Sequence, residues 1–303
     1  MNYHRTLQFR FKTYKFCKDR IWFHRYDIDV EKELKKIQRT YNEVKELEMD
    51  EVSSRGCMDY IDANYLREVW VTEMTTTLSH GETIDISIFV IEGAEKPDNI
   101  PDRVWLKLQN IKQGLLFSRS QFGAPLSVTM IRKFHKILCN GLFDFPGTTR
   151  TSHVGASRTL VVYERPGNID AKLATLVDFV NEFSNTRLDT MLLLSTFFFA
   201  EFLRIHPFVN GNGRVARLLV SFLLSSITVV PISIFYNVTR EQYLQILGDA
   251  QWEENPVGLC TLFLLSAKQT ANVARFLLLE EEPATEKDIH DDYCCSCFPF
   301  KTA

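Results

Sequence analysis

The segment from Leu192 to Phe202 constrains the fold more than any other, because it is apolar on all sides of a helix and contains the runs LLL and FFF. A helix that is hydrophobic all round has to be covered by other elements on every side. The helical pattern extends over residues 188–205. We therefore expect a bundle of helices with residues 188–205 at its centre.

Most of the remaining chain also has helical periodicity. Apolar residues recur every three or four positions from Val30 to Met49. Further helices are predicted over residues 60–76, 103–117, 127–139, 170–185, 213–226, 240–250 and 258–278. Thr239 and Gln242 have the spacing of a capping box at the start of the helix over 240–250. Residues 84–91 fit a helix or a strand, and the polar stretch 93–102 is predicted to be a loop.

Two stretches favour extended structure. In TLQFRFKTYKF (6–16), apolar Leu7, Phe9 and Phe11 alternate with polar residues, which predicts a short strand or an extended arm. Its basic and aromatic residues would also suit an RNA or membrane surface, although a strand with one solvated face is the simpler interpretation. Residues 145–168 combine glycines, prolines and a β-branched apolar run, which predicts a β-hairpin. The expected fold class is all-α, a mostly helical bundle with one β-hairpin.

Composition narrows the partners and the compartment. The 303 residues suffice for one large domain or two small ones, and a net charge of −3 gives no field that attracts nucleic acid. Seven cysteines without zinc-ligand spacing indicate reduced thiols in a cytosol-like compartment. The apolar run from Leu218 to Phe235 is interrupted by serines and Pro231, which argues against a membrane span. We expect a cytoplasmic protein with no transmembrane segment and no nucleic-acid partner.

The string IHPFVNGNGRVAR (205–217) interrupts the apolar core with polar residues. A residue before proline is pushed out of helical geometry, so His206 is expected at the end of the central helix. Glycines and a helix N-terminus follow, where backbone N–H groups bind anions, and Arg214 and Arg217 share one face of the next helix. A histidine can accept a proton near neutral pH. An isolated His-Pro or Gly-Asn-Gly is usually only a turn, but the whole string predicts a phosphate-transfer site.

At these residues the sequence resembles the Fic family, whose signature is His-Pro-Phe-x-Asp/Glu-Gly-Asn-Gly/Lys-Arg-x-x-Arg. HPFVNGNGRVAR (206–217) matches every specified position except Asn210. The stretch PGTTRTSHV resembles the approach to the family's flap, and VTREQYLQILGDAQWEENP resembles its helix after the signature. The resemblance extends over residues 105–275 as a Fic domain. It leaves an N-terminal part, 1–104, with a strand or arm and helices, and an acidic, cysteine-containing tail, 276–303.

The resemblance implies transfer of AMP from ATP to a Ser, Thr or Tyr hydroxyl of a target protein, with release of pyrophosphate. It makes His206 the catalytic base. It assigns binding of the nucleotide phosphates to Gly211, Asn212, Gly213, Arg214 and Arg217. Tyr243 and Gln251 fall where relatives shape the adenine pocket, and the target would dock at a flap over 150–163. The location would be cytoplasmic, or a host cytosol if the protein is a delivered effector.

Two departures leave alternatives open. Asn210 stands where the family has a carboxylate that binds Mg²⁺, and an amide oxygen brings no charge, so metal binding should be weakened. The alternative function is a nucleotide-binding regulatory or interaction module with a degenerate site and little turnover. Glu73 loosely matches an inhibitory glutamate that would pair with Arg217, but a plain surface glutamate is the simpler interpretation. The protein would then be unregulated in cis or inhibited by a separate protein. The three cysteines near the C-terminus are either acylated anchors or disordered thiols.

Overall fold

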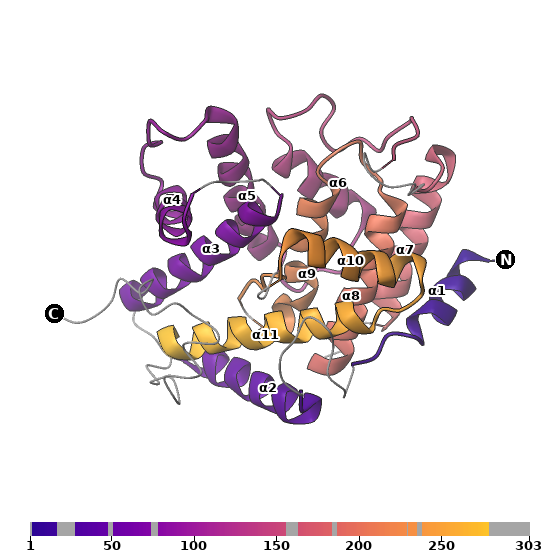
Figure 1. Cartoon of the computed structure of the whole chain (residues 1–303), viewed down its shortest axis with the longest axis horizontal. Helices are drawn as coiled ribbons and strands as arrows, with labels where there is room; N and C mark the ends of the chain where they lie inside the picture. Colours follow the sequence, from indigo (N-terminus) through magenta and orange to yellow (C-terminus); the bar gives the residue numbers. More distant parts are fainter. Residues whose placement is uncertain are drawn as a thin grey trace.

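The computed structural model of the chain describes residues 2–16, 28–47, 51–73, 78–155, 163–183, 187–228, 230–234 and 238–278. Within these ranges the secondary structure is helical (Figure 1). The α-helices are α1 (Tyr3–Phe11), α2 (Val30–Glu46), α3 (Glu51–Glu73), α4 (His80–Glu92), α5 (Asp102–Ser120), α6 (Val128–Leu138), α7 (Ile169–Phe183), α8 (Leu188–Ile205), α9 (Asn212–Thr228), α10 (Arg240–Trp252) and α11 (Val257–Leu278). A short 3₁₀ helix, η1 (Pro166–Asn168), precedes α7.

Helix α8 is the centre of the bundle, as the apolar segment predicts. It packs against α7, α9, α10 and α11, which lie around it in Figure 1. The side chains of Phe197, Phe198, Phe199 and Phe202 have no exposed surface. Burying one such side chain contributes roughly 1.5–3 kcal/mol, so α8 is held rigidly by its neighbours. Helices α2, α3 and α5 pack on α9 as well, and this joins the N-terminal helices to the rest of the bundle.

Helices α4 and α10 each begin with a capping box. The Thr239 hydroxyl accepts a hydrogen bond from the Gln242 N–H, and the Gln242 side chain accepts one from the Thr239 N–H. This is the predicted capping box of α10. The ambiguous segment 84–91 lies within helix α4, which Ser79 and Glu82 cap in the same way.

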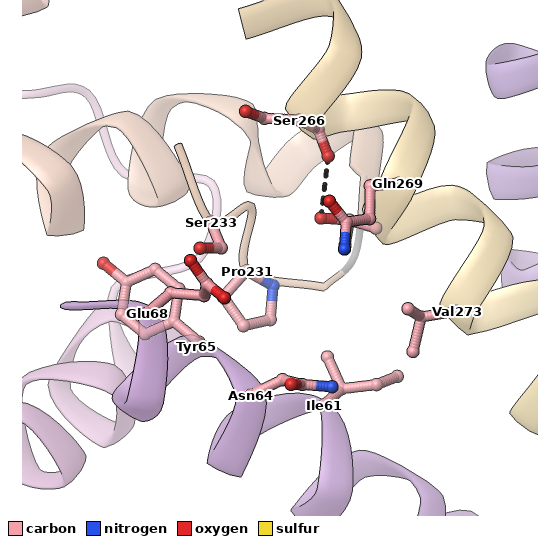
Figure 2. A pocket seen from close by; sticks show the side chains of 10 residues that line it. Ile61, Asn64, Tyr65, Glu68, Pro231, Ser233, Ser266, Gln269 and Val273 are labelled. Atoms are coloured by element: carbon pink, nitrogen blue, oxygen red, sulfur yellow. Dashed lines mark hydrogen bonds between the residues drawn. The ribbon is translucent and has the colours of Figure 1, made fainter. Parts of the chain in front are cut away.

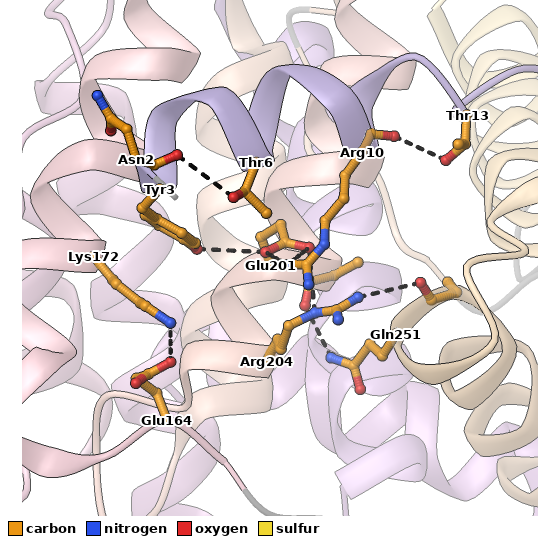
Figure 3. Close-up of polar contacts among 12 residues, drawn as sticks. Asn2, Tyr3, Thr6, Arg10, Thr13, Glu164, Lys172, Glu201, Arg204 and Gln251 are labelled. Carbon is orange, nitrogen blue, oxygen red and sulfur yellow. Dashed lines mark hydrogen bonds and ion pairs between the residues drawn. The ribbon is translucent and has the colours of Figure 1, made fainter.

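The prediction of a strand over residues 6–16 is wrong, because residues 3–11 form helix α1. Tyr3, Leu7 and Phe11 are spaced four apart, so a helix places them on one face, and Leu7 is fully buried. Phe9, which the alternating pattern grouped with them, is 67% exposed. Figure 3 shows the polar contacts of the same helix, where Tyr3 and Arg10 reach the carboxylate of Glu201 in α8.

The described residues of 145–168 do not show the predicted hairpin. Residues 156–162 lie outside the described residues, and the described residues around them form loops, bends, a single bridge residue at Gly155 and η1. The tail from residue 279 also lies outside the described residues. Among the helices that the structure describes, none is long and apolar enough to cross a membrane.

Candidate active site

His206 is fixed at the junction between α8 and α9. It is the C-cap residue of α8, in a left-handed conformation with φ 51° and ψ 62°, and its N–H donates to the carbonyl of Phe202. This conformation is uncommon for a residue other than glycine and costs on the order of 1 kcal/mol or more, so surrounding contacts must maintain it. Pro207 follows and prevents α8 from continuing, as expected from the sequence.

The imidazole of His206 contacts Leu203 and Tyr163. Its Nδ1 lies 3.3 Å from the carbonyl oxygen of Leu203. Because a carbonyl only accepts hydrogen bonds, this contact assigns the proton to Nδ1 and the lone pair to Nε2. The ring of Tyr163 stacks on the imidazole, with centroids 3.8 Å apart and 16° between the planes. The half-buried ring therefore has a defined orientation and tautomer.

Asn212 stabilises the turn of the signature loop. Its side-chain oxygen accepts the N–H of Phe208 at 3.0 Å, and its side-chain nitrogen donates to the carbonyl of Phe208 at 2.8 Å. Only 2% of Asn212 is exposed. The side chain of Asn212 therefore closes the signature loop, and its role in phosphate binding stays a prediction.

His135 in α6 contacts the signature loop. The sequence did not predict this role, because a single histidine in an amphipathic helix has no distinctive pattern. Its ring stacks on Phe208 at 3.8 Å and 12°. Its Nδ1 accepts the N–H of Gly147 at 2.7 Å, and its Nε2 lies 3.1 Å from the carbonyl of Asn210. Burial lowers the pKa of His135 to about 4, helped by the nearby charge of Arg214 and opposed by the bond to Asn210. The neutral form of His135 therefore joins α6 to the loop.

Gly211 lets the loop approach α6 closely. It has φ +77°, and a Cβ atom there would lie 2.6 Å from the Sγ of Cys139. Helix α9 begins just after it, with the N–H of Val215 bonded to the carbonyl of Gly211 at 3.1 Å. The N–H groups that precede Val215 in α9, including that of Gly213, have no helical carbonyl one turn earlier to bond. This helix start has the features of an anion-binding site.

The two arginines of the signature lie in the interior. Arg214 is 5% exposed, donates to the carbonyl of Leu138 at 3.0 Å and lies over the ring of Phe143 at 5.8 Å. Arg217 is 2% exposed and lies 5.4 Å from the centroid of the Tyr243 ring. A guanidinium has five N–H donors, so the contact with Leu138 uses only part of the capacity of Arg214. A phosphate can reach Arg217 only if the side chains that cover it move.

The two residues suggested for the adenine pocket are also buried. Tyr243 is 5% exposed and makes an edge contact with Phe199 at 6.4 Å. Gln251 is 5% exposed, and its side chain donates to the carbonyl of Ala200 at 2.9 Å. Both residues lie in α10 and contact α8.

Asn210 is exposed, and its side-chain oxygen accepts the N–H of Gly211 at 2.8 Å. Among the described residues, no three acidic, histidine or cysteine side chains come close enough to hold a metal ion. One neutral amide oxygen, already engaged with the backbone, does not make a magnesium site. The residues present therefore do not fit a protein-held Mg²⁺.

Glu73 is the last residue of α3, and its side chain lies outside the described residues. Helix α3 does line a pocket of about 40 Å³, together with Pro231, Ser233 and α11 (Figure 2). Tyr65 and Glu68 of α3 lie in its wall, and none of the signature residues does. Its volume accommodates only a few water molecules, so it is not a nucleotide pocket.

Part of the chain, including the signature loop, is similar to known proteins. Residues 125–224 match the family model described as Fic/DOC family. The chain is 29% identical over 110 residues to the protein adenylyltransferase and cysteine protease IbpA of Histophilus somni (strain 2336). That match covers 36% of this chain but only 3% of the relative, so the two proteins correspond over a short region.

Solved structures share the fold at low sequence identity. A Fic domain-containing signalling protein from Bacteroides thetaiotaomicron aligns with a TM-score of 0.66 at 18% identity, over 80% of this chain and 98% of that one. A fragment of Fic-1 from C. elegans aligns with a TM-score of 0.69 at 17% identity, over 84% and 74%. IbpAFic2 in complex with adenylylated Cdc42 aligns with a TM-score of 0.50 at 17% identity, over 88% and 76%.

The helical bundle around α8 thus has the Fic fold. The family match spans α6 to α9 and includes the whole signature loop. The match of residues 125–224 to the Fic/DOC family model confirms the resemblance that residues 206–217 predict.

Proposed function

We propose that this protein is a protein adenylyltransferase that transfers AMP from ATP to a hydroxyl of a target protein. The observation that carries the proposal is the position of His206, whose imidazole is held at the C-terminal end of α8, five residues before the Gly211 turn and the start of α9. A base and an anion-binding helix start on one short loop are what phosphoryl chemistry requires.

In the proposed reaction, Nε2 of His206 accepts the proton of a Ser, Thr or Tyr hydroxyl. The hydroxyl oxygen attacks the α-phosphorus of ATP, the bond between that phosphorus and the oxygen leading to the β-phosphate breaks, and pyrophosphate leaves. The amides at the start of α9, including Gly213, offset charge on the α-phosphate oxygens. Arg214 and Arg217 would bind the β- and γ-phosphates, Arg217 after the residues that cover it move.

The comparisons support the class of substrate. The relative IbpA is named as an adenylyltransferase, and the complex with adenylylated Cdc42 contains a protein substrate. By extension, we place a target protein beside residues 150–163, where Tyr163 lies against His206. Because Asn210 supplies no charge, any Mg²⁺ would be held mainly by the nucleotide.

A second candidate is a nucleotide-binding module with little turnover. Two observations favour it: the neutral side chain of Asn210 is engaged with the backbone of Gly211, and Arg217 is 2% exposed. Such a module would bind ATP without releasing pyrophosphate.

Incubation with ATP labelled at either the α- or the γ-phosphate, with a cell lysate as the source of acceptor proteins, tests the proposal. Nucleotidyl transfer predicts protein-bound label from the α position and none from the γ position. Label retained only from the γ position would show phosphorylation instead. ATP binding without protein-bound label from either position would favour the second candidate.

A further inference from the structure

Arg150 is a buried cation beside the signature loop, with 4% of the residue exposed. Its guanidinium donates to four main-chain carbonyls: His206 (2.7 Å), Ser152 (2.8 Å), Glu164 (2.5 Å) and Ile205 (3.3 Å). Its own N–H donates to the carbonyl of Pro207 at 2.9 Å. Burial of a charge is unfavourable unless hydrogen bonds compensate for it. The guanidinium of Arg150 therefore has to keep the position in which these carbonyls accept its N–H groups.

Two of these carbonyls belong to the end of α8. The carbonyls of the last helical turn have no intrahelical partner, and Arg150 supplies one to Ile205 and to the cap residue His206. A positive charge at a helix C-terminus is also favourable for the helix dipole. Arg150 therefore stabilises the left-handed backbone of His206, which is otherwise unfavourable.

The other two carbonyls lie on either side of residues 156–162. Ser152 precedes this segment and Glu164 follows it, and one guanidinium binds both. The Glu164 carboxylate is itself bonded to Lys172 in α7, as Figure 3 shows. Arg150 thus fixes the backbone of Glu164, and Lys172 binds its side chain.

This fixed backbone carries the ring that contacts His206. Tyr163 directly precedes Glu164, and its ring stacks on the imidazole at 3.8 Å. Arg150 thus constrains His206 in two ways. It binds the carbonyl of His206 directly, and it fixes the backbone next to Tyr163, whose ring stacks on the imidazole.

We infer that Arg150 is a positioning residue that, together with Tyr163, sets the orientation of the His206 imidazole. The inference deepens the proposed function and rests on it, since orientation matters for catalysis only if His206 is the base. Arginine suits this role because its planar fork satisfies several carbonyls at once, whereas lysine has one compact ammonium group. Misplacement of a reacting group by about 1 Å can cost on the order of 100-fold in rate.

The orientation can be measured without any reaction, by NMR of the full chain with ¹³C-labelled histidine. The chain has seven histidines, and loss of a signal in His206→Gln assigns the one of interest. The face of the Tyr163 ring shields the imidazole proton. Tyr163→Ala should therefore move this signal downfield, and Tyr163→Phe, which keeps the ring, should leave it in place.

Arg150→Lys is the decisive variant. We expect it to move the His206 signal downfield, in the direction of Tyr163→Ala. Arg119→Lys serves as the matched control, because it removes a two-pronged contact with Asp62 from α5 to α3 and should leave the His206 signal unchanged. An unchanged His206 signal in folded Arg150→Lys would overturn the inference and reduce Arg150 to a helix cap.

Kinetics give the second readout. If α-label transfer is found, Arg150→Lys and Tyr163→Ala should lower kcat on the order of 10- to 100-fold with little change in the KM for ATP. A change confined to KM would also overturn the inference. If no transfer is found but the NMR signal moves as described, the positioning contact stands and the proposed reaction fails.

Discussion

Arg10 in α1 donates to the carboxylate of Glu201 in α8, with Nη1 and Oε2 3.1 Å apart, across 191 positions of the sequence. Glu201 has no exposed surface and lies five residues before His206. Arg204 also approaches the carboxylate at 3.3 Å, and the hydroxyl of Tyr3 donates to it at 3.4 Å. The buried charge in the central helix is thus compensated in part by the first helix of the chain.

Arg10→Met should lower the free energy of unfolding by about 2 kcal/mol, less than the 3–5 kcal/mol for a buried pair that loses its only partner, because Arg204 remains. Glu201→Met in the same background should restore part of this loss, since the buried carboxylate is then absent. Urea unfolding of the single and double variants measures the coupling. Arg5→Met is the control, because Arg5 is exposed on the same helix, and a loss as large as that of Arg10→Met would contradict the account.

Gly211→Ala should lower the free energy of unfolding on the order of 3 kcal/mol, because it adds a steric clash to an unfavourable backbone conformation. The clash would be with Cys139 Sγ, 2.6 Å from the added Cβ. Gly93→Ala separates the two effects, since Gly93 has φ +79° and no atom within 4 Å of such a Cβ. It should cost only about 1 kcal/mol. Equal losses in the two variants would show that close packing against Cys139 is unimportant.

Lowering the pH should reduce the free energy of unfolding, because the pKa of His135 is lowered to about 4 in the folded chain. Between that value and the ordinary pKa of histidine near 6.5, the unfolded chain binds a proton that the folded chain does not, so acid favours unfolding. From pH 7 to pH 5 the contribution of His135 to the free energy of unfolding should decrease by about 2 kcal/mol. It should decrease further until the pH falls to about 4.

Urea unfolding of the parent chain and of His135→Gln at pH 7 and pH 5 measures this contribution. The parent should lose more stability than the variant over this interval. His153→Gln, at an exposed position, should behave as the parent. The same pH dependence in His135→Gln as in the parent would assign the effect to other groups.

Asn210→Asp should raise Mg²⁺-dependent α-label transfer on the order of tenfold, a difference of about 1.4 kcal/mol, because it adds the missing negative charge. The carboxylate can still accept the N–H of Gly211, so the loop should keep its shape. Transfer is measured over a series of Mg²⁺ concentrations, with Asn210→Ala as the control that removes the oxygen altogether. If Asn210→Asp and the parent respond identically to Mg²⁺, residue 210 does not contribute to metal binding.

The central helix and its neighbours were predictable because local signals agree there. The predicted range 188–205 coincides with α8, and the capping box at Thr239 marks the start of α10. Helix α1 was not predictable in this way, because residues 6–16 fit both an alternating and a four-residue spacing. The contact that favours the helix, from Arg10 to Glu201, is distant in the sequence.

In the candidate site, too, the sequence predicted what depends on neighbouring residues but not what depends on distant contacts. The order of residues in 206–217 identified the loop, since the base, the glycines and the arginines are adjacent in the sequence. What each side chain contacts depends on other elements, as with Arg214 and the carbonyl of Leu138 in α6. His135 and Arg150 have no sequence pattern, because their partners are backbone groups that only the fold brings near.

The central claim, that His206 is the base of a nucleotidyl transfer, is tested most directly by His206→Ala assayed for both ATP binding and α-label transfer. ATP at 100 times its Kd should stabilise the parent by about 2.7 kcal/mol, and the variant should keep this stabilisation because the phosphate-binding groups are unchanged. Transfer should fall on the order of 10²- to 10⁴-fold, the usual contribution of a general base. Transfer at the parental rate by a variant that still binds ATP would contradict the account.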